Sequence, residues 1–179
     1  GNNAGHTVVV GDEEFKLRLI PSGILYPGKT CVIGNGVVVD PRVMLSEISY
    51  LQEKGVDTGN LRVSERAHVI MPYHVAIDTY EEAAKGDQKI GTTKNGIGPC
   101  YMDKYARVGI RIADLMDKEV FAERLASVLK SKNDMIVKLY GGEPFDFDTM
   151  YKEYCDYADQ IRPYVADTSV LVSEALERN

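Results

Sequence analysis

Two polar stretches of the sequence combine residue types that could bind a ligand and move a proton. The first is residues 2–7 (NNAGHT), where the amides can donate and accept hydrogen bonds. Gly5 lets a ligand approach the backbone closely, and His6 can exchange a proton near neutral pH. A run of valines follows, so the stretch lies at the mouth of a strand. The alternative is a polar turn whose amides satisfy loose backbone groups, and the residue types alone favour neither.

The second stretch is residues 91–109 (GTTKNGIGPCYMDKYARVG). Glycines and the hydroxyls of Thr92 and Thr93 precede a helix that we expect to start at Pro99. A helix N-terminus with free N–H groups favours phosphate. The stretch is not a Walker A loop, because that motif needs Lys-Ser/Thr directly after its last glycine, whereas Gly96 is followed by Ile97.

Lys104 and Arg107 add positive charge to the helix that follows. An arginine side chain can bind a phosphate through two parallel N–H···O hydrogen bonds. Taken alone, however, Arg107 stands four residues after Asp103, and this spacing favours a surface ion pair worth about 0.3–0.5 kcal/mol. His68 and His74 have no partnered cysteine or acidic pattern, so we interpret both as structural.

These stretches need an α/β framework to position them, with strands early in the chain and helices late. Residues 8–10 and 15–20 predict a hairpin with its turn at 11–14, and residues 30–40 and 61–65 predict further strands. Asp40 and Pro41 predict the start of a helix. Apolar periodicity predicts the later helices, which we expect over residues 72–85, from 99, around 121–139 and 150–161, and over 165–178.

Bulk composition narrows the function classes. The 179 residues carry a net charge of −6 and a pI of about 5.1, which argues against a nucleic-acid partner. The three cysteines form no CxxC pair, which is typical of a reduced, intracellular protein. No apolar run is long enough to span a bilayer, so we expect a cytoplasmic protein with no membrane partner.

The two stretches, in this order, resemble the adenylosuccinate synthetase family. The resemblance extends to four further segments: LIPSGIL at 19–25, GNGVVVDP at 34–41, IGTTKNGIGPCYMDKYARVGIRIADL at 90–115 and RPYVADTSVLV at 162–172. It implies a ligase, adenylosuccinate synthase, that acts in AMP formation within purine biosynthesis. In that reaction GTP phosphorylates the 6-oxygen of IMP, and the amino group of L-aspartate then displaces the phosphate to give adenylosuccinate. GTP is a co-substrate, and Mg²⁺ spreads the charge of the moving phosphoryl group.

The resemblance also assigns roles to single residues. His6 resembles the general acid that protonates the leaving GDP, and the backbone carbonyl of Gly5 resembles a Mg²⁺ ligand. Thr93 resembles the threonine that holds the IMP 5′-phosphate, and Arg107 the arginine that reaches this phosphate from the other subunit of a homodimer, which reverses the ion-pair interpretation. The full sets are Asn3, Ala4, Gly5, His6, Thr93 and Arg107 for IMP, and Gly5, His6 and Thr7 for the GTP phosphates.

Family members are more than twice as long as this chain, and their phosphate loop, aspartate loop and guanine-reading segment have no counterpart here. We therefore expect an internal part of the enzyme that is inactive alone. Its fold class would be α/β, part of a P-loop-related mixed or parallel sheet domain, divided into an α/β part with the IMP-site loop (1–115) and a helical subdomain (116–179). Two alternatives remain: a non-catalytic nucleotide- or phosphate-binding module, and a dimerisation module.

Overall fold

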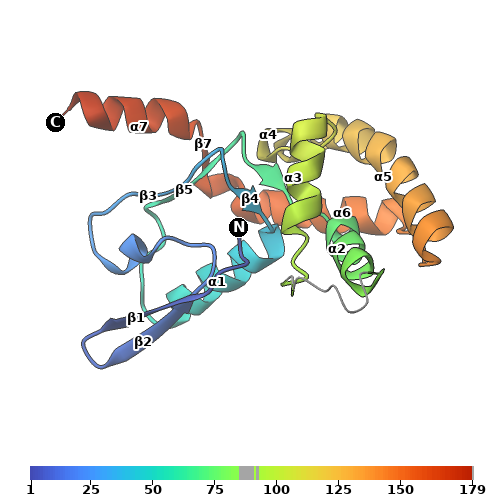
Figure 1. Ribbon diagram of the computed structural model, residues 1–179. Coiled ribbons are helices and arrows are strands. Elements are labelled where there is room, and N and C mark those ends of the chain that lie inside the picture. Colours follow the sequence, from blue (N-terminus) through green and yellow to red (C-terminus); the bar gives the residue numbers. More distant parts are fainter. Residues whose placement is uncertain (85–90, 92, 179) are drawn as a thin grey trace.

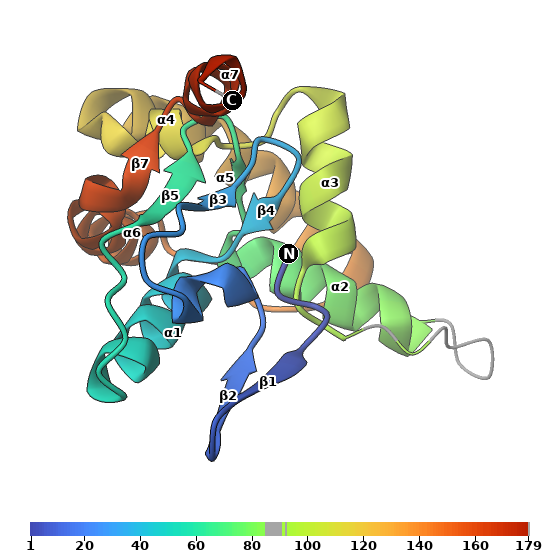
Figure 2. The ribbon, with the colours of Figure 1, turned by 90° about the vertical axis from the view of Figure 1, so that its left-hand side faces the viewer.

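A parallel three-stranded sheet forms the centre of the chain in the computed structural model, which describes residues 1–84, 91 and 93–178. Its strand order is β3 (Cys31–Ile33), β5 (Leu61–Ser64) and β7 (Val165–Ala166), with β5 in the middle. Cys31 lies opposite Leu61, and Val63 lies opposite Val165. Figure 2 shows the three arrows side by side. The expected α/β class with a parallel sheet is confirmed.

Two smaller pairs of strands flank this sheet. β4 (Val38–Val39) pairs in parallel with β6 (His68–Val69). β1 (His6–Val10) and β2 (Glu13–Leu17) form an antiparallel hairpin, which projects from the body in Figure 1. Gly11 has a φ of 62° at its turn, a left-handed conformation that glycine adopts without steric cost. The expected hairpin is therefore confirmed.

Helix α1 (Pro41–Glu53) begins as its sequence predicts. The Asp40 side chain accepts from the backbone N–H groups of Arg42 and Val43, and Pro41 occupies the first turn. Nearly two turns into the helix, the buried Glu47 carboxylate reaches back to the segment after β2. It accepts hydrogen bonds from the backbone N–H groups of Arg18, of Leu19 at 2.9 Å and of Ile20 at 3.0 Å. A single carboxylate thus ties the hairpin to the body.

The remaining helices cover the sheet and build the second half of the chain (Figure 1). One apolar cluster runs through both halves, from Phe15 on β2 to Ile161 at the end of α6. Among the residues that the structure describes, no helix combines the length and the hydropathy needed to cross a bilayer. The helical bounds are α2 (Pro72–Ala84), α3 (Ile97–Ala106), α4 (Ile112–Met116), α5 (Lys118–Tyr140), α6 (Phe147–Ile161) and α7 (Thr168–Glu177), with 3₁₀ turns η1 (Ser22–Leu25) and η3 (Arg162–Tyr164).

Two expected helix starts are wrong. The helix expected over 165–178 begins at Thr168, capped by Asp167, because Val165 and Ala166 instead add a strand beside β5. The helix expected from Pro99 starts two residues earlier, at Ile97. The division at residue 115 stays a prediction.

Replacing Glu47 with alanine should strongly destabilise the fold, because three backbone N–H groups lose their acceptor in a part-buried place. We expect the free energy of unfolding to fall by about 2–4 kcal/mol. Urea denaturation measures it. Glu53→Ala, at an exposed position of the same helix, is the control and should cost less than about 0.5 kcal/mol. Equal losses for both variants would contradict the role of Glu47.

Candidate functional site

The polar stretch at residues 2–7, which we call the front corner, is open to solvent except at the buried Asn2. Asn3, Ala4 and Gly5 are exposed residues that lead into β1. His6 and Thr7 are the first two residues of that strand and are also exposed, with His6 paired opposite Leu17. The imidazole and the backbone before it are therefore accessible to a ligand. Figure 2 shows that this end of the chain lies beside α3.

Gly91 and residues 93–96 belong to a loop, which we call the threonine loop, that is fixed to α2 at both ends. The N–H of Gly91 donates to Glu82 at 2.7 Å, and the N–H of Gly96 donates to Asp78 at 2.9 Å. Both carboxylates are buried. Thr93 lies between these anchors with an exposed side chain. Thr92 lies outside the described residues.

The structure brings the front corner and the threonine loop together. The Asn95 side-chain amide donates to the backbone carbonyl of Asn2 at 3.4 Å. Gly1 packs so tightly beside Ile97 and Val38 that a Cβ there would lie 2.5 Å from the Ile97 side chain. Asn2 is buried, and its side-chain oxygen has no hydrogen-bond partner among the described residues. Sequence reasoning assigned no role to Asn95, which makes the contact that joins the two stretches.

The N-terminus of α3 is suited to an anion. Its N-cap, Gly96, offers no side-chain acceptor, and no acidic residue lies in the first turn. The helix dipole and the uncapped N–H groups therefore leave a partial positive charge at this end. This end lies directly after the threonine loop, so Thr93 and the helix terminus could hold the same phosphate.

Arg107 lies at the opposite end of α3. Ten residues separate the two ends, which amounts to about 15 Å of helix. Arg107 is the C-cap and adopts a left-handed conformation with φ 63°, which costs a non-glycine residue roughly 1 kcal/mol. Within one chain, therefore, the structure does not bring Thr93 and Arg107 to a common point.

The surface ion pair that spacing favoured between Arg107 and Asp103 is wrong. Asp103 is buried and turns inward, where its carboxylate contacts His74 and Lys132. The physical reason is that Asp103 lies on the face of α3 that packs against α2 and α5, whereas Arg107 is exposed. Arg107 faces a cleft instead.

That cleft has a volume of about 550 Å³ and is strongly cationic. Four of its lining residues are basic, and Asp114 is its only acidic lining residue among the residues described. Burial lowers the pKa of His68 in its wall to about 4, with Lys104 and Arg111 adding to the effect, so this imidazole is neutral at pH 7. The lining residues are His68, Lys104, Tyr105, Arg107, Gly109, Arg111, Asp114 and Arg124.

Sequence reasoning missed three members of this cleft. His68 was interpreted as structural, and nothing marked Arg124, because it comes from α5 and reaches the cleft only through tertiary packing. Arg111 carried a weak signal as a basic residue within the family-like segment 90–115. Its distance from Arg107 along the chain carried none, because α3 ends at Ala106 and the two arginines do not share a helix.

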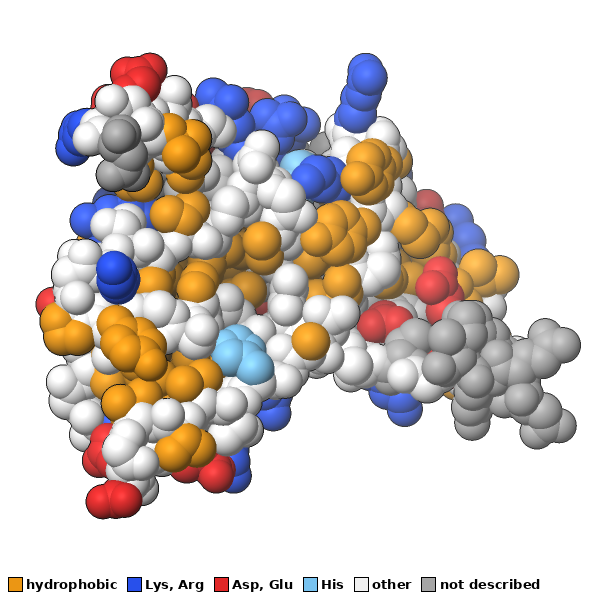
Figure 3. All heavy atoms as spheres, turned by 60° about the vertical axis from the view of Figure 1, so that its left-hand side comes forward, with side chains coloured by type: hydrophobic (Ala, Val, Ile, Leu, Met, Phe, Trp, Pro, Cys, Tyr) orange, Lys and Arg blue, Asp and Glu red, His pale blue; other side chains and the backbone are white. Residues whose placement is uncertain are grey.

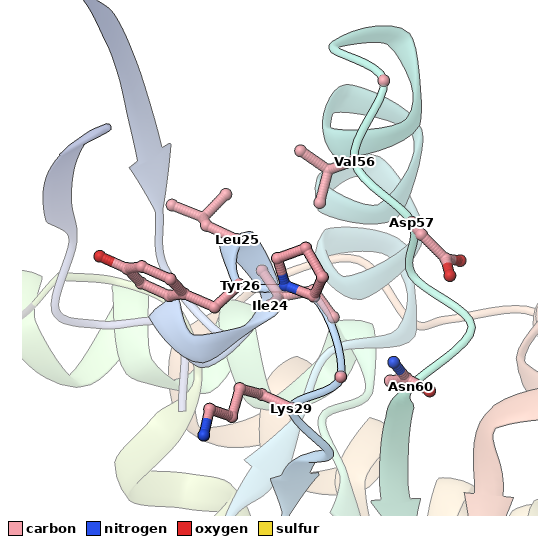
Figure 4. Close-up of a pocket in the computed structure, with 10 residues that line it drawn as sticks. Ile24, Leu25, Tyr26, Lys29, Val56, Asp57 and Asn60 are labelled. Atoms are coloured by element: carbon pink, nitrogen blue, oxygen red, sulfur yellow. The ribbon is translucent and has the colours of Figure 1, made fainter. Parts of the chain in front are cut away.

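A second pocket of about 300 Å³ lies between η1 and the segment after α1 (Figure 4). Ile24, Leu25 and Val56 give it apolar walls. In Figure 4, Lys29 and Asp57 extend toward opposite sides. A binding site needs a few polar groups that converge on a ligand, so we do not assign this pocket a role.

The described residues contain no group of three or more His, Cys, Asp or Glu side chains arranged to hold a metal ion. The one metal ligand that the family resemblance implies within this chain is the backbone carbonyl of Gly5. One such carbonyl fits Mg²⁺, which keeps several waters and takes its other ligands from phosphates.

Comparison with known proteins defines the family. The described residues form an α/β fold with a parallel sheet, in which an exposed polar corner lies beside a loop with several glycines. The family model for adenylosuccinate synthetase matches residues 1–179. Adenylosuccinate synthetase from Carboxydothermus hydrogenoformans is 62% identical over 177 residues, covering 99% of this chain and 42% of that protein. The enzyme from Bacillus thuringiensis strain Al Hakam is 59% identical over 179 residues, again 42% of its length.

A solved structure agrees with these matches. Fully ligated adenylosuccinate synthetase from Plasmodium falciparum superposes with a TM-score of 0.87 at 32% identity, covering 99% of this chain and 41% of that one. The chain belongs to the adenylosuccinate synthetase family. It spans about 42% of the length of the curated relatives that it matches.

Adding a methyl group at Gly96 should disrupt the threonine loop. Gly96 has a φ of 71°, and a Cβ there would lie 2.8 Å from the Val75 nitrogen and 2.9 Å from the His74 carbonyl carbon. Gly96→Ala should lower the free energy of unfolding by about 1–3 kcal/mol, measured by chemical denaturation.

The matched control is Gly98→Ala, two residues further along in the first turn of α3, where a Cβ would meet no atom within 4 Å. Alanine at this helical position should stabilise the chain by up to roughly 1 kcal/mol. A neutral Gly96→Ala variant would show that the loop does not need this close approach to α2.

Proposed function

We propose that this chain is the IMP-binding part of a longer GTP-dependent adenylosuccinate synthetase and is inactive alone. The longer protein converts IMP, L-aspartate and GTP to adenylosuccinate, GDP and phosphate through 6-phosphoryl-IMP. The observation that carries the proposal is the hydrogen bond from Asn95 to Asn2, which holds the front corner beside the threonine loop. Two stretches far apart in the sequence thereby form one surface.

The roles of the front corner are those that the family resemblance implies, and its exposure to solvent supports them. His6 protonates the bridging oxygen of GDP as the γ-phosphoryl group leaves GTP for the 6-oxygen of IMP. A general acid must lie on an accessible surface near the leaving group and titrate near the working pH, as an imidazole can. Asn3, Ala4, Gly5 and His6 line the IMP side, and Gly5, His6 and Thr7 line the GTP phosphates.

The chain would supply few of the ligands of a magnesium ion. The carbonyl of Gly5 is the group that would contact Mg²⁺, and the ion when bound would neutralise charge on the phosphates. All other ligands would come from nucleotide, water or the rest of the longer protein. The chain's own task is to keep Gly5 and His6 fixed at the start of β1.

The IMP 5′-phosphate lies between Thr93 and the N-terminus of α3. The hydroxyl of Thr93 donates to a phosphate oxygen, and the uncapped helix end favours the charge. Arg107 binds the same phosphate in the neighbouring subunit of a homodimer. The roughly 15 Å of helix between the two ends of α3 supports this, because one chain cannot bring Thr93 and Arg107 to one phosphate.

A second candidate function is a dimerisation or nucleotide-binding module without catalysis. The exposed apolar side chains of Met102, Tyr105 and Val108 on and after α3 favour an association role. They adjoin Arg107, so association and the shared site use one surface. Both functions are expected in the cytoplasm, which agrees with three buried, unpaired cysteines.

A mixed dimer tests the shared site. In the longer protein, His6→Ala should lower kcat by about 10²–10⁴-fold, and Arg107→Ala should raise KM for IMP by about tenfold or more. A heterodimer of the two variants has one site with both defects and one site with neither. It should therefore recover about half the activity of the unaltered dimer.

Recovery after mixing would be measured by adenylosuccinate formation at an IMP concentration well below the raised KM of the Arg107→Ala variant, where both variant homodimers are nearly inactive. The control mixes each variant with itself and should show no recovery. If the heterodimer stays as inactive as the two parents, His6 and Arg107 do not come from different subunits. Turnover by the 179-residue chain alone would overturn the proposal that it is only part of the catalytic unit.

A further inference from the structure

Titratable side chains from three helices meet inside the protein. Asp103 on α3 lies between His74 on α2 and Lys132 on α5. His74 Nε2 is 2.9 Å from one carboxylate oxygen, and Lys132 Nζ is 2.5 Å from the other. The three side chains are 0%, 5% and 12% exposed for His74, Asp103 and Lys132. We call this set the Asp103 cluster.

The hydrogen bonds fix the charges of the cluster. The N–H of Met71 donates to His74 Nδ1 at 2.9 Å, so the ring proton is on Nε2 and is donated to Asp103. Burial lowers the pKa of His74, which keeps the ring neutral. Burial alone would raise the pKa of Asp103, but the hydrogen bonds from His74 and Lys132 outweigh it and the pKa is lowered. One anion is therefore balanced by one cation.

The backbone of Asp103 determines how α3 ends. Its carbonyl accepts from the N–H groups of Val108 at 3.0 Å and Gly109 at 3.1 Å. The Arg107 N–H donates to the same carbonyl and to that of Lys104. The backbone of Gly109 packs closely against His68, because a Cβ at this position would lie 2.7 Å from the His68 ring. Asp103 thus binds His74 and Lys132 through its carboxylate. Through its backbone carbonyl it also accepts the hydrogen bonds that fix Arg107 in its left-handed conformation.

The cluster also relates α5 to this end of α3. Lys132 and Arg124 lie on the same helix, about two turns apart, and Arg124 lines the cleft with Arg107. Buried ion pairs seldom stabilise a protein more than apolar residues of the same size. Their strict geometry does, however, fix one arrangement of the elements that they join.

We propose that the Asp103 cluster is a positioning site that holds Arg107 in its cleft-facing conformation and aligns it with Arg124. The role of Arg107 toward the IMP phosphate rests on the proposed function. The positioning itself rests on contacts within this chain. His74 and Lys132 are accordingly positioning residues that touch no substrate.

Amide hydrogen exchange tests the positioning in the 179-residue chain. Lys132→Met removes the cation but keeps the stem, and should speed exchange at Val108 and Gly109 by about tenfold relative to a core amide such as Val63. Lys132→Arg restores the charge and should retain protection. Lys130→Met, at an exposed position of the same helix, is the matched control and should change nothing.

Equal loss of protection at Val63 and at residues 108–109 would mean that Lys132 serves only global stability, and would overturn the proposal. Unchanged protection at Val108 and Gly109 in Lys132→Met would also overturn the proposal. If Lys132→Met does not fold, His74→Leu removes the other donor to Asp103, and loss of protection confined to Val108 and Gly109 supports the proposal whereas equal loss at Val63 or no loss overturns it.

A double-mutant cycle in the longer protein tests the consequence. Lys132→Met should raise KM for IMP by about tenfold with little change in kcat, and should have no further effect once Arg107 is alanine. Independent, multiplying effects would overturn the proposal. If Arg107→Ala alone leaves KM for IMP unchanged, the proposed IMP role of Arg107 fails, while the exchange data still decide the positioning.

Discussion

Helix α3 is held at both ends by buried carboxylates, and every proposed role in this chain depends on that constraint. At its start, Asp78 accepts the N–H of Gly96. At its end, Asp103 is fixed by His74 and Lys132 while its carbonyl closes the last turn. A ten-residue helix fixed in this way is a rigid spacer of about 15 Å between the loop that carries Thr93 and the C-cap Arg107.

Under the proposed function, this spacing makes the site of one subunit depend on another. The start of α3 lies beside the front corner with His6, whereas its end faces a separate cationic cleft. A phosphate held at Thr93 in one subunit can then meet Arg107 only from a second subunit. Figure 3 shows apolar side chains across the middle of one face of the molecule, with Lys and Arg side chains near its upper edge.

Local features of the sequence predicted much of the fold. Asp40 with Pro41 starts α1 through contacts within one turn, and the alternating pattern after Gly11 predicts the hairpin, because both signals lie within a few residues. Strand β7 was missed, because Val165 and Ala166 become a strand only by pairing with β5, about 100 residues earlier. A strand of two residues is too short to show the alternation of apolar and polar residues that predicts a strand.

In the candidate site, too, local sequence features were predictable and contacts between distant segments were not. Residue types and order identified the front corner and the threonine loop, and the structure adds the Asn95–Asn2 contact that joins them. The cleft around Arg107 could not be predicted in full, because His68 and Arg124 approach it from other elements. The inward turn of Asp103 was missed for a similar reason, since its partners His74 and Lys132 lie 29 residues away on either side.

The most direct measurement is a crystal structure of the longer protein with inosinate bound. We predict that the phosphoryl oxygens lie within hydrogen-bond distance of Thr93 in one subunit and of Arg107 in the other, with His6 facing the purine. A phosphate bound away from both of these side chains, or contacted by Thr93 and Arg107 of the same chain, would contradict the shared site.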